Sequence, residues 1–210
     1  MARVHDAVVL LPTYNERSNI EQILPAILAA ADVDILVLDD YSPDGTGELA
    51  QKIADTNPRV SVMHRPGKKG LGKAYLAGFE AALSRGYQRI IQMDADFSHP
   101  ISQLPTLLAL SNDHDLVLGS RWVPGGGTEN WPLFRKLLSR GGSLYARTLL
   151  NVPIRDLTGG FKCFQRHVLE ALPLNEVQST GYSFQIEMTY RTLKHGFSVL
   201  ETPIVFIERE

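Results

Sequence analysis

The sequence predicts an α/β protein with a Rossmann-like, mostly parallel sheet that is covered by helices on both faces. Short apolar runs of strand length alternate with longer segments whose apolar residues recur at helical spacing. Unusual polar residues follow the strand-like runs, and this is where an open α/β sheet binds its ligands. The composition agrees, because 210 residues, 44% of them hydrophobic and 21% charged, suffice for a soluble domain with a sizeable core.

The first expected strand, residues 7–11, is a continuous apolar run that ends at Pro12. The segment 19–31 carries isoleucine or leucine at i, i+3, i+4, i+7 and i+8 from Ile20, which predicts a helix with one apolar face. The same alternation then continues along the chain. Further strands are expected at residues 34–38, 60–63, 89–93 and 115–118, and further helices at 48–55, 74–83 and 104–110.

Charge and cysteine content exclude several classes of function. A net charge of −2 gives no reason to expect nucleic acid as a partner. The single cysteine, Cys163, excludes an internal disulfide, is typical of a reducing compartment, and is expected to be a packed small residue rather than a nucleophile. No apolar run reaches the roughly 18 residues of a membrane span, and the first residues lack the apolar core of a signal peptide. We therefore expect a cytosolic chain. Since the sequence stops directly after a strand-like run, we also expect a C-terminal tail to be absent from it.

Nearly every unusual polar group lies just after an expected strand, so the groups should converge on one edge of the sheet. They suggest a nucleotide held by a carboxylate, a metal on its phosphates and an arginine near the charge that develops during reaction. The groups are residues 12–16 after the first strand, Asp39 and Asp40 after the second, Asp94 and Asp96 after the fourth, and residues 119–121 after the fifth.

Asp94 and Asp96 are the centre of this arrangement. Alternate residues of a strand share a face, so both carboxylates should point the same way where the strand leaves the sheet. Hard oxygen ligands suit Mg²⁺ or Mn²⁺, with phosphates completing the coordination shell. An acidic turn before a helix that begins at Pro100 explains the same residues without a metal.

Two glycine-rich nucleotide motifs were tested against the sequence. The first expected strand-to-helix turn contains no glycine, which excludes the dinucleotide-binding fingerprint there. The segment 67–74 matches a phosphate-binding loop except at Ala74, where Ser or Thr should bind Mg²⁺. A P-loop hydrolase is therefore disfavoured. A flexible basic loop that closes over phosphates and a solvated turn both remain open for this segment.

Six ordered motifs resemble the family 2 glycosyltransferases of the GT-A fold, and among them the dolichol-phosphate and polyprenol-phosphate mannose synthases. The resemblance spans residues 7–209 and implies a single GT-A catalytic domain over 1–210, with a nucleotide-binding half (7–121) and an acceptor-binding half (122–210) that carries a helical extension. The motifs are LPTYNE at 11–16, DDYSPDGT at 39–46, KGLG at 69–72, MDAD at 93–96, GSR at 119–121 and ENWP at 129–132.

The resemblance also implies roles for individual residues. Asp94, Asp96 and Arg121 match the catalytic positions, and Asp94, Asp96 and Ser98 match the metal site, although Ser98 stands where some relatives carry Gln. The nucleotide positions are Pro12, Tyr14, Glu16, Leu38, Asp40, Asp94 and Ala95. The acceptor-phosphate positions are Arg135, Ser139 and Arg209.

The second half departs from the strand-helix alternation. Residues 125–127 are expected to form a flexible hinge, and residues 131–150 an amphipathic helix pair broken at Gly141 and Gly142. A basic and aromatic helix can lie in a membrane interface, whereas packing on the core with solvated charges is the alternative. Asp156 and Glu187 are expected either to touch sugar hydroxyls or to act as capping or core-edge carboxylates. His99 is expected to cap or pack beside the metal loop.

The function implied by the resemblance is metal-dependent, inverting transfer of mannose from GDP-mannose to dolichyl or polyprenyl phosphate, with Mg²⁺ or Mn²⁺ as cofactor. The enzyme would act as a peripheral protein at the cytoplasmic face of the membrane, with a membrane partner subunit or a missing membrane segment. Two alternatives remain open. One is transfer from UDP-glucose or another sugar nucleotide to polyprenyl phosphate or polysaccharide, and the other is a non-catalytic sugar-nucleotide-binding subunit.

Overall fold

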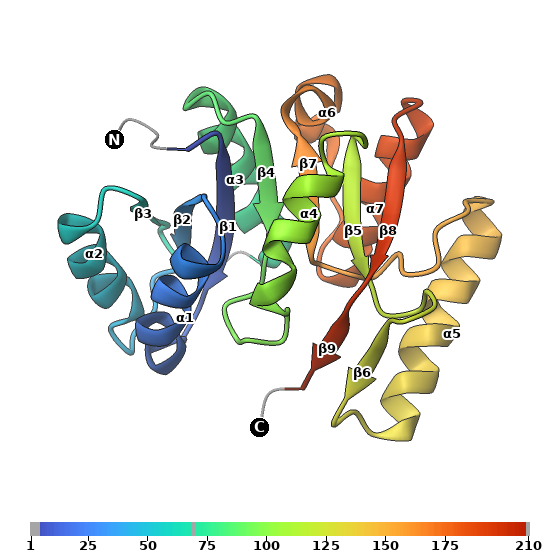
Figure 1. Cartoon of the computed structure of the whole chain (residues 1–210), viewed down its shortest axis with the longest axis horizontal. Helices are drawn as coiled ribbons and strands as arrows, with labels where there is room; N and C mark the ends of the chain where they lie inside the picture. The colour runs from blue at the N-terminus through green and yellow to red at the C-terminus, as the bar shows by residue number, and fades with distance from the viewer. Residues whose placement is uncertain (1–4, 69, 209–210) are drawn as a thin grey trace.

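A computed structural model describes residues 5–68 and 70–208 (Figure 1). The strands are β1 (Ala7–Thr13), β2 (Asp34–Asp39), β3 (Val60–His64), β4 (Arg89–Gln92), β5 (Leu116–Ser120), β6 (Gly127–Glu129), β7 (Lys162–Gln165), β8 (Val199–Pro203) and β9 (Val205–Ile207). The α-helices are α1 (Arg17–Ala30), α2 (Thr46–Thr56), α3 (Leu71–Ser84), α4 (Leu104–Leu110), α5 (Leu133–Leu150), α6 (Arg166–Ala171) and α7 (Tyr182–Lys194), and two 3₁₀ turns cover Ile101–Gln103 and Leu174–Glu176.

The main sheet has the strand order β3-β2-β1-β4-β7-β5-β8. Strand β7 runs antiparallel to both of its neighbours, β4 and β5, and the remaining pairs in this sheet are parallel. A second, two-stranded sheet joins β6 and β9 below the carboxyl edge of the main sheet (Figure 1). The parallel strands β1, β2, β4 and β5 therefore deliver their following loops to one edge.

Helices cover both faces of the sheet, and alternate residues of β1 show how the faces are divided. Val9 and Leu11 pack with the apolar residues of α1, α2 and α4, whereas Val8 and Leu10 pack with those of α3, α6 and α7. Strands buried on both faces read as continuous apolar runs, and this is the reason for the pattern in the sequence. The predicted mostly parallel sheet with helices on both faces is confirmed.

The strand-helix alternation of the first half is also confirmed, with boundaries that differ by a few residues. Strand β7 was not predicted, because a chain reversal into the middle of the sheet leaves no periodic signal. Gly125 has φ +86° in a turn, and Gly127 begins β6 rather than belonging to a hinge segment without regular structure.

Helix α5 is one continuous helix, so the predicted break at Gly141 and Gly142 is wrong. Each glycine costs about 1 kcal/mol in a helix interior, which the hydrogen bonds of the flanking turns outweigh. Only Ser143 and Ala146 of this helix are buried. Figure 1 shows α5 at the β8 end of the sheet, reaching past the carboxyl edge beside β6. Among the described residues, no helix is both long and apolar enough to cross a membrane.

Candidate active site

The carboxyl edge of the sheet contains a cavity of about 290 Å³. Its lining residues come from both halves of the chain. Asp94 and Asp96 come from the loop after β4, Arg121 follows β5, and Arg135 lies in the first turn of α5. Glycines 159 and 160, from the loop before β7, expose bare backbone on the wall. The cavity thus brings two carboxylates and two guanidinium groups together.

The Asp94 loop is fixed by neighbours that do not themselves carry charge. The main-chain N–H of Asp94 donates to His99 Nδ1 at 3.0 Å, which leaves the proton on Nε2, 3.7 Å from Asp94 Oδ2. Burial lowers the pKa of His99, so the ring stays neutral. The Tyr75 hydroxyl donates to Asp94 Oδ1 at 3.4 Å, and burial together with the Asp94 charge raises the pKa of that phenol. The expectation that His99 packs beside this loop therefore agrees with its contacts.

The oxygens of this loop fit a hard divalent cation. Asp94 and Asp96 are both partly exposed to the cavity, and Asp96 Oδ1 accepts the N–H of Ser98 at 3.1 Å. Ser98 Oγ is buried and has no hydrogen-bond partner among the described residues, but Ser98 is not one of the residues that line the cavity. Within the described ranges, no cluster of three or more His, Cys, Asp or Glu could hold a metal alone. A cation here would complete its shell with water and substrate phosphate.

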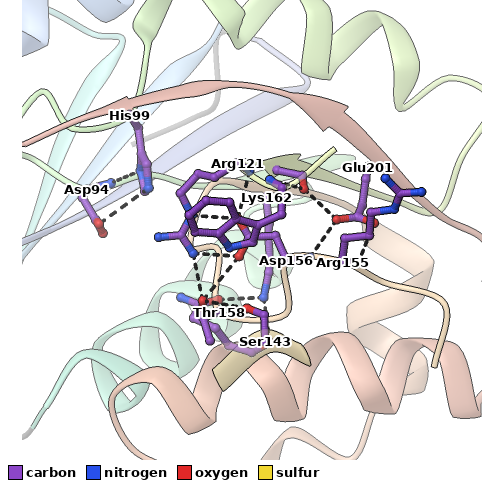
Figure 2. A network of polar contacts seen from close by, with 12 residues as sticks. Asp94, His99, Arg121, Ser143, Arg155, Asp156, Thr158, Lys162 and Glu201 are labelled. Carbon is purple, nitrogen blue, oxygen red and sulfur yellow. Dashed lines mark hydrogen bonds and ion pairs between the residues drawn. The ribbon is translucent and has the colours of Figure 1, made fainter. Parts of the chain in front are cut away.

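The carboxylate of Asp156 fixes the Arg121 side chain, and Glu201 in turn fixes Asp156 (Figure 2). Its Nε and Nη2 donate to the two oxygens of Asp156, each at 2.7 Å, and Nη2 also donates to Thr158 Oγ1 at 2.8 Å. Glu201 of β8 accepts the main-chain N–H of Asp156 at 2.9 Å. Asp156 is fully buried, so of its two expected roles the core-edge carboxylate fits. Its two hydrogen bonds fix the orientation of the Arg121 guanidinium group.

Arg135 and Arg121 both lie over the indole ring of Trp131. The guanidinium carbon of Arg135 is 4.3 Å from the Trp131 ring centroid, and that of Arg121 is 5.4 Å away. Arg135 also forms an ion pair with Glu208, directly after β9. Ser139, one turn further along α5, lines a second cavity of about 390 Å³ together with Arg121 and Arg135. Arg209, the third acceptor-phosphate position, lies outside the described residues.

The second cavity is mostly apolar and continues from the first. Both cavities share Arg121, Trp131, Arg135, Thr158 and Tyr182 in their walls. The second adds Leu138 and Ile186, which make its wall apolar beyond the cations. A ligand with an anionic head and an apolar tail could span the two.

Apart from Asp94, the expected nucleotide positions lie at the same edge but outside the wall of the first cavity. Tyr14 is 37% exposed, and Lys68 Nζ lies 4.0 Å from the centroid of its ring. Asp40 is buried and paired with Arg65. Leu38 is fully buried in the core, so only its backbone can face a ligand. Pro12 and Glu16, from the end of β1 and its loop, are half-buried, and Ala95 is buried between the two aspartates.

Three loops at this edge contain a non-glycine residue in the left-handed region. Asn15 has φ +60°, Tyr41 has φ +57° and Phe97 has φ +61°, and they follow β1, β2 and β4. For an aromatic residue this conformation is uncommon, and such residues cluster at ligand sites because the surroundings must hold them there. The backbone therefore identifies the same edge as the charged side chains do.

Several other expected residues are accounted for by packing. Glu187 lies within α7 and accepts hydrogen bonds from the Ser179 N–H and from Arg191 one turn later, so of its expected roles the core-edge carboxylate fits. Cys163 is fully buried, and burial raises the pKa of its thiol to about 12, so it is a packed residue. In the segment 67–74, Lys69 lies outside the described residues and Lys73 is exposed.

Sequence reasoning missed four residues near the site: Arg65, Lys162, Gln185 and Glu208. Arg65 and Glu208 carry no local motif, because their partners Asp40 and Arg135 are distant in the sequence. Lys162 did leave a signal, since it interrupts the apolar run Phe161–Phe164. A lysine within a buried strand needs a specific partner.

Comparison with known proteins defines the class. The profile of Glycosyl transferase family 2 matches residues 8–172. The chain therefore belongs to glycosyl transferase family 2, and it is a glycosyltransferase. This confirms the resemblance found in the sequence, and the P-loop alternative is set aside.

Individual relatives are more specific. The chain is 51% identical over 206 residues to the polyprenol monophosphomannose synthase of Mycolicibacterium smegmatis, covering 97% of this chain and 78% of the relative. It is 46% identical to the undecaprenyl-phosphate mannosyltransferase of Micrococcus luteus, covering 97% and 84%. It is 38% identical to the dolichol-phosphate mannosyltransferase of Pyrococcus furiosus, covering 94% of this chain and 55% of that protein.

Solved structures confirm the GT-A-like fold. Glucosyl-3-phosphoglycerate synthase from Mycobacterium tuberculosis, in complex with Mn²⁺, UDP and glucosyl-3-phosphoglycerate, matches with a TM-score of 0.70 over 95% of this chain and 70% of that chain. The sequence identity is 20%, so the likeness establishes the fold alone.

Proposed function

We propose that this enzyme transfers mannose from GDP-mannose to dolichyl or polyprenyl phosphate, with inversion at the anomeric carbon, at a membrane surface. The observation that carries the proposal is the joined pair of cavities, in which carboxylates and guanidinium groups meet an apolar channel. The names of the three mannosyl-transferring relatives support the sugar and the class of acceptor. In this proposal residues 7–121 bind the nucleotide and residues 122–210 bind the acceptor.

On the donor side, Asp94, Asp96 and Ser98 would hold Mg²⁺ or Mn²⁺. Such a cation, when bound, neutralises charge on the diphosphate. Tyr14, Glu16 and Asp40, with the backbone of Pro12, Leu38 and Ala95, would hold the nucleotide, because their loops lie at the same edge as Asp94. Asp156 and Glu201 keep Arg121 aimed so that it stabilises charge on the departing diphosphate.

On the acceptor side, the nucleophile needs no general base. A phosphate monoester has a second pKa near ~6 and carries the attacking charge at neutral pH. Its oxygen forms the bond to the anomeric carbon while the bond from that carbon to the GDP oxygen breaks. The protein must hold two anions together in line, and Arg121, Arg135 and Ser139 line the region where their charges would meet. A single displacement inverts the anomeric centre.

Helix α5 supplies the membrane contact in this proposal. Seven of its eight large apolar side chains are 60–75% exposed. The helix contains four basic residues and no Asp or Glu, so its charge suits anionic phospholipid. The exposed apolar residues are Leu133, Phe134, Leu137, Leu138, Leu144, Tyr145 and Leu149. A partner subunit or membrane segment beyond this chain would add to the contact.

The test is transfer of labelled sugar from GDP-mannose, GDP-glucose, UDP-glucose and UDP-galactose to undecaprenyl phosphate in vesicles, with Mg²⁺ or Mn²⁺ and with a chelator. Label entering the organic phase from GDP-mannose and only with metal is the expected result. Transfer from UDP-glucose instead would replace the donor in the proposal. Metal-dependent binding without transfer in the presence of acceptor vesicles would favour a non-catalytic sugar-nucleotide-binding subunit.

A further inference from the structure

The first residue of β7, Lys162, is a fully buried lysine beside the active site. Its Nζ donates to the main-chain oxygen of Gln185 at 2.7 Å and to the side-chain Oε1 of the same residue at 2.8 Å. Burial lowers the pKa of Lys162 to about 7. Even the neutral amine keeps two N–H donors, which match these two acceptors, so the arrangement holds in either protonation state.

Gln185 lies in the first turn of α7 and connects this lysine to the cavity. It is 3% exposed and lines the same cavity as Asp94, Asp96 and Arg121. A glutamine amide has an accepting oxygen and a donating nitrogen on opposite sides. Because Lys162 needs acceptors, the oxygen faces the lysine and the NH₂ group must face away from it.

The NH₂ group is next to the bare backbone of Gly160 at the cavity wall. A Cβ at Gly160 would lie 3.5 Å from Gln185 Nε2 and 3.5 Å from His99 Cε1, so the amide is close to the ring that supports the Asp94 loop. No residue in the described part of the chain accepts a hydrogen bond from Nε2. Nε2 is not one of the fully buried unpaired side-chain atoms of the described residues, so it is open to the cavity, where a ligand oxygen or water can accept its hydrogen bond.

We propose that Gln185 Nε2 donates a hydrogen bond to a hydroxyl of the donor's sugar, and that Lys162 is the positioning residue that fixes the amide in this orientation. The inference rests on the proposed sugar-nucleotide donor. A neutral amide suits a neutral hydroxyl, whereas the diphosphate is served by the Asp94 loop and the arginines. In this proposal Gln185 recognises the sugar of the donor, and residues other than Gln185 bind the nucleotide.

The experiment compares the affinities of GDP-mannose and GDP, with Mg²⁺, by calorimetry. Gln185→Leu removes the donor, and we expect about tenfold weaker binding of GDP-mannose with GDP unchanged. Gln185→Glu keeps an acceptor for Lys162 but turns an oxygen toward the cavity, so it should fold and show the same selective loss. Lys162→Met frees the amide to rotate, and we expect a loss of about threefold for GDP-mannose alone.

Two controls separate positioning from general loosening of α7. Thr189→Val deletes a hydroxyl that donates to the same main-chain oxygen of Gln185 at 3.1 Å while the amide stays bound to Lys162. It should leave both affinities at the wild-type values. The double variant Lys162→Met/Gln185→Leu should bind GDP-mannose no more weakly than Gln185→Leu, because Lys162 acts through the amide.

A binding series of deoxy-mannose GDP-sugars identifies the hydroxyl, since the analogue that lacks it should bind wild type and Gln185→Leu equally. Equal affinity of wild type and both Gln185 variants for GDP-mannose overturns the inference, as does additivity in the double variant. If wild type transfers mannose while the variants keep full selectivity, only this inference fails. If wild type binds no GDP-sugar, the proposed function fails and the inference fails with it.

Discussion

The loops of the proposed nucleotide half and helix α5 of the proposed acceptor half differ in how their polar and apolar side chains are covered. In the first, the groups satisfy one another: Asp39 accepts from Thr13 and Ser42, and Asp40 pairs with Arg65. In the second, α5 buries only Ser143 and Ala146 and leaves its large apolar side chains in solvent. The polar groups of the first region are therefore paired within the fold, while the exposed apolar face of α5 is the surface for which we propose membrane contact.

The largest expected effect comes from the carboxylate at which the two regions meet. Asp96→Ala removes a cavity oxygen that lies at the surface of the sheet edge rather than in the core. We expect turnover to fall by at least about 10³-fold, because the proposed cation loses a ligand and then no longer neutralises charge on the diphosphate. Transfer of labelled mannose and a thermal melt measure the two consequences. The melting temperature should stay at the wild-type value.

The matched control is Asp32→Asn, which changes an exposed carboxylate at the amino end of the sheet. It should keep both activity and stability. Near-normal turnover in Asp96→Ala would refute the assignment of this loop to the diphosphate.

Asp156→Asn is expected to affect stability and activity together, which sharpens the contrast with Asp96. It leaves the buried Arg121 guanidinium without its bidentate partner. Breaking a buried ion pair costs about 3–5 kcal/mol, so the urea midpoint should fall clearly. Activity should fall by about 10² because Arg121 is no longer aimed. An unchanged midpoint would show that Thr158 alone suffices to hold Arg121.

The accuracy of the sequence-based prediction also differs between the two regions, and it is higher for residues 7–121 than for the residues that follow. Apolar runs and helical spacing in residues 7–121 predicted five strands and four helices. The prediction was possible because the buried face of each element appears in the sequence as a periodic apolar pattern. Asp94, Asp96 and Arg121 were expected at one edge because the loops after parallel strands must meet there, and they do line one cavity. Arg135 lines the same cavity, but it was expected there only from the family resemblance.

Beyond residue 121 the information is tertiary. The direction of β7 depends on a gap between β4 and β5 that no local pattern encodes. The continuity of α5 through Gly141 depends on flanking turns. The partners of Arg121 and Lys162 lie 35 and 23 residues away, so the roles of Asp156 and Gln185 could be seen only in the folded chain.

A moderate effect is expected from the surface of α5. Replacing Leu133, Phe134 and Leu137 by Ser should leave stability unchanged, because these side chains are 63–75% exposed. If each inserts halfway into the interface, the loss is ~1 kcal/mol per residue, or about 100-fold in partitioning. Sedimentation with vesicles that contain anionic phospholipid measures it, and transfer to a short, water-soluble prenyl phosphate should be retained. Unchanged partitioning would mean that another surface contacts the membrane.

The smallest expected effect tests whether the acceptor half already contains a substitute for its ligand. Glu208 pairs with Arg135, which is a proposed acceptor-phosphate residue, so in this proposal the carboxylate competes with the phosphate for Arg135. A partly exposed ion pair is worth about 0.2–1 kcal/mol, so Glu208→Gln should lower the KM for polyprenyl phosphate by about 1.4- to fivefold. The value of kcat and the KM for GDP-mannose should not change. Glu129→Gln is the matched control, because this exposed residue sits on the neighbouring strand β6, opposite Ile207 in the register. A higher KM in Glu208→Gln would instead mean that Glu208 holds Arg135 in the geometry that binds phosphate. The charged groups of the proposed acceptor region would then be positioned by pairing within the fold, as those of the nucleotide loops are.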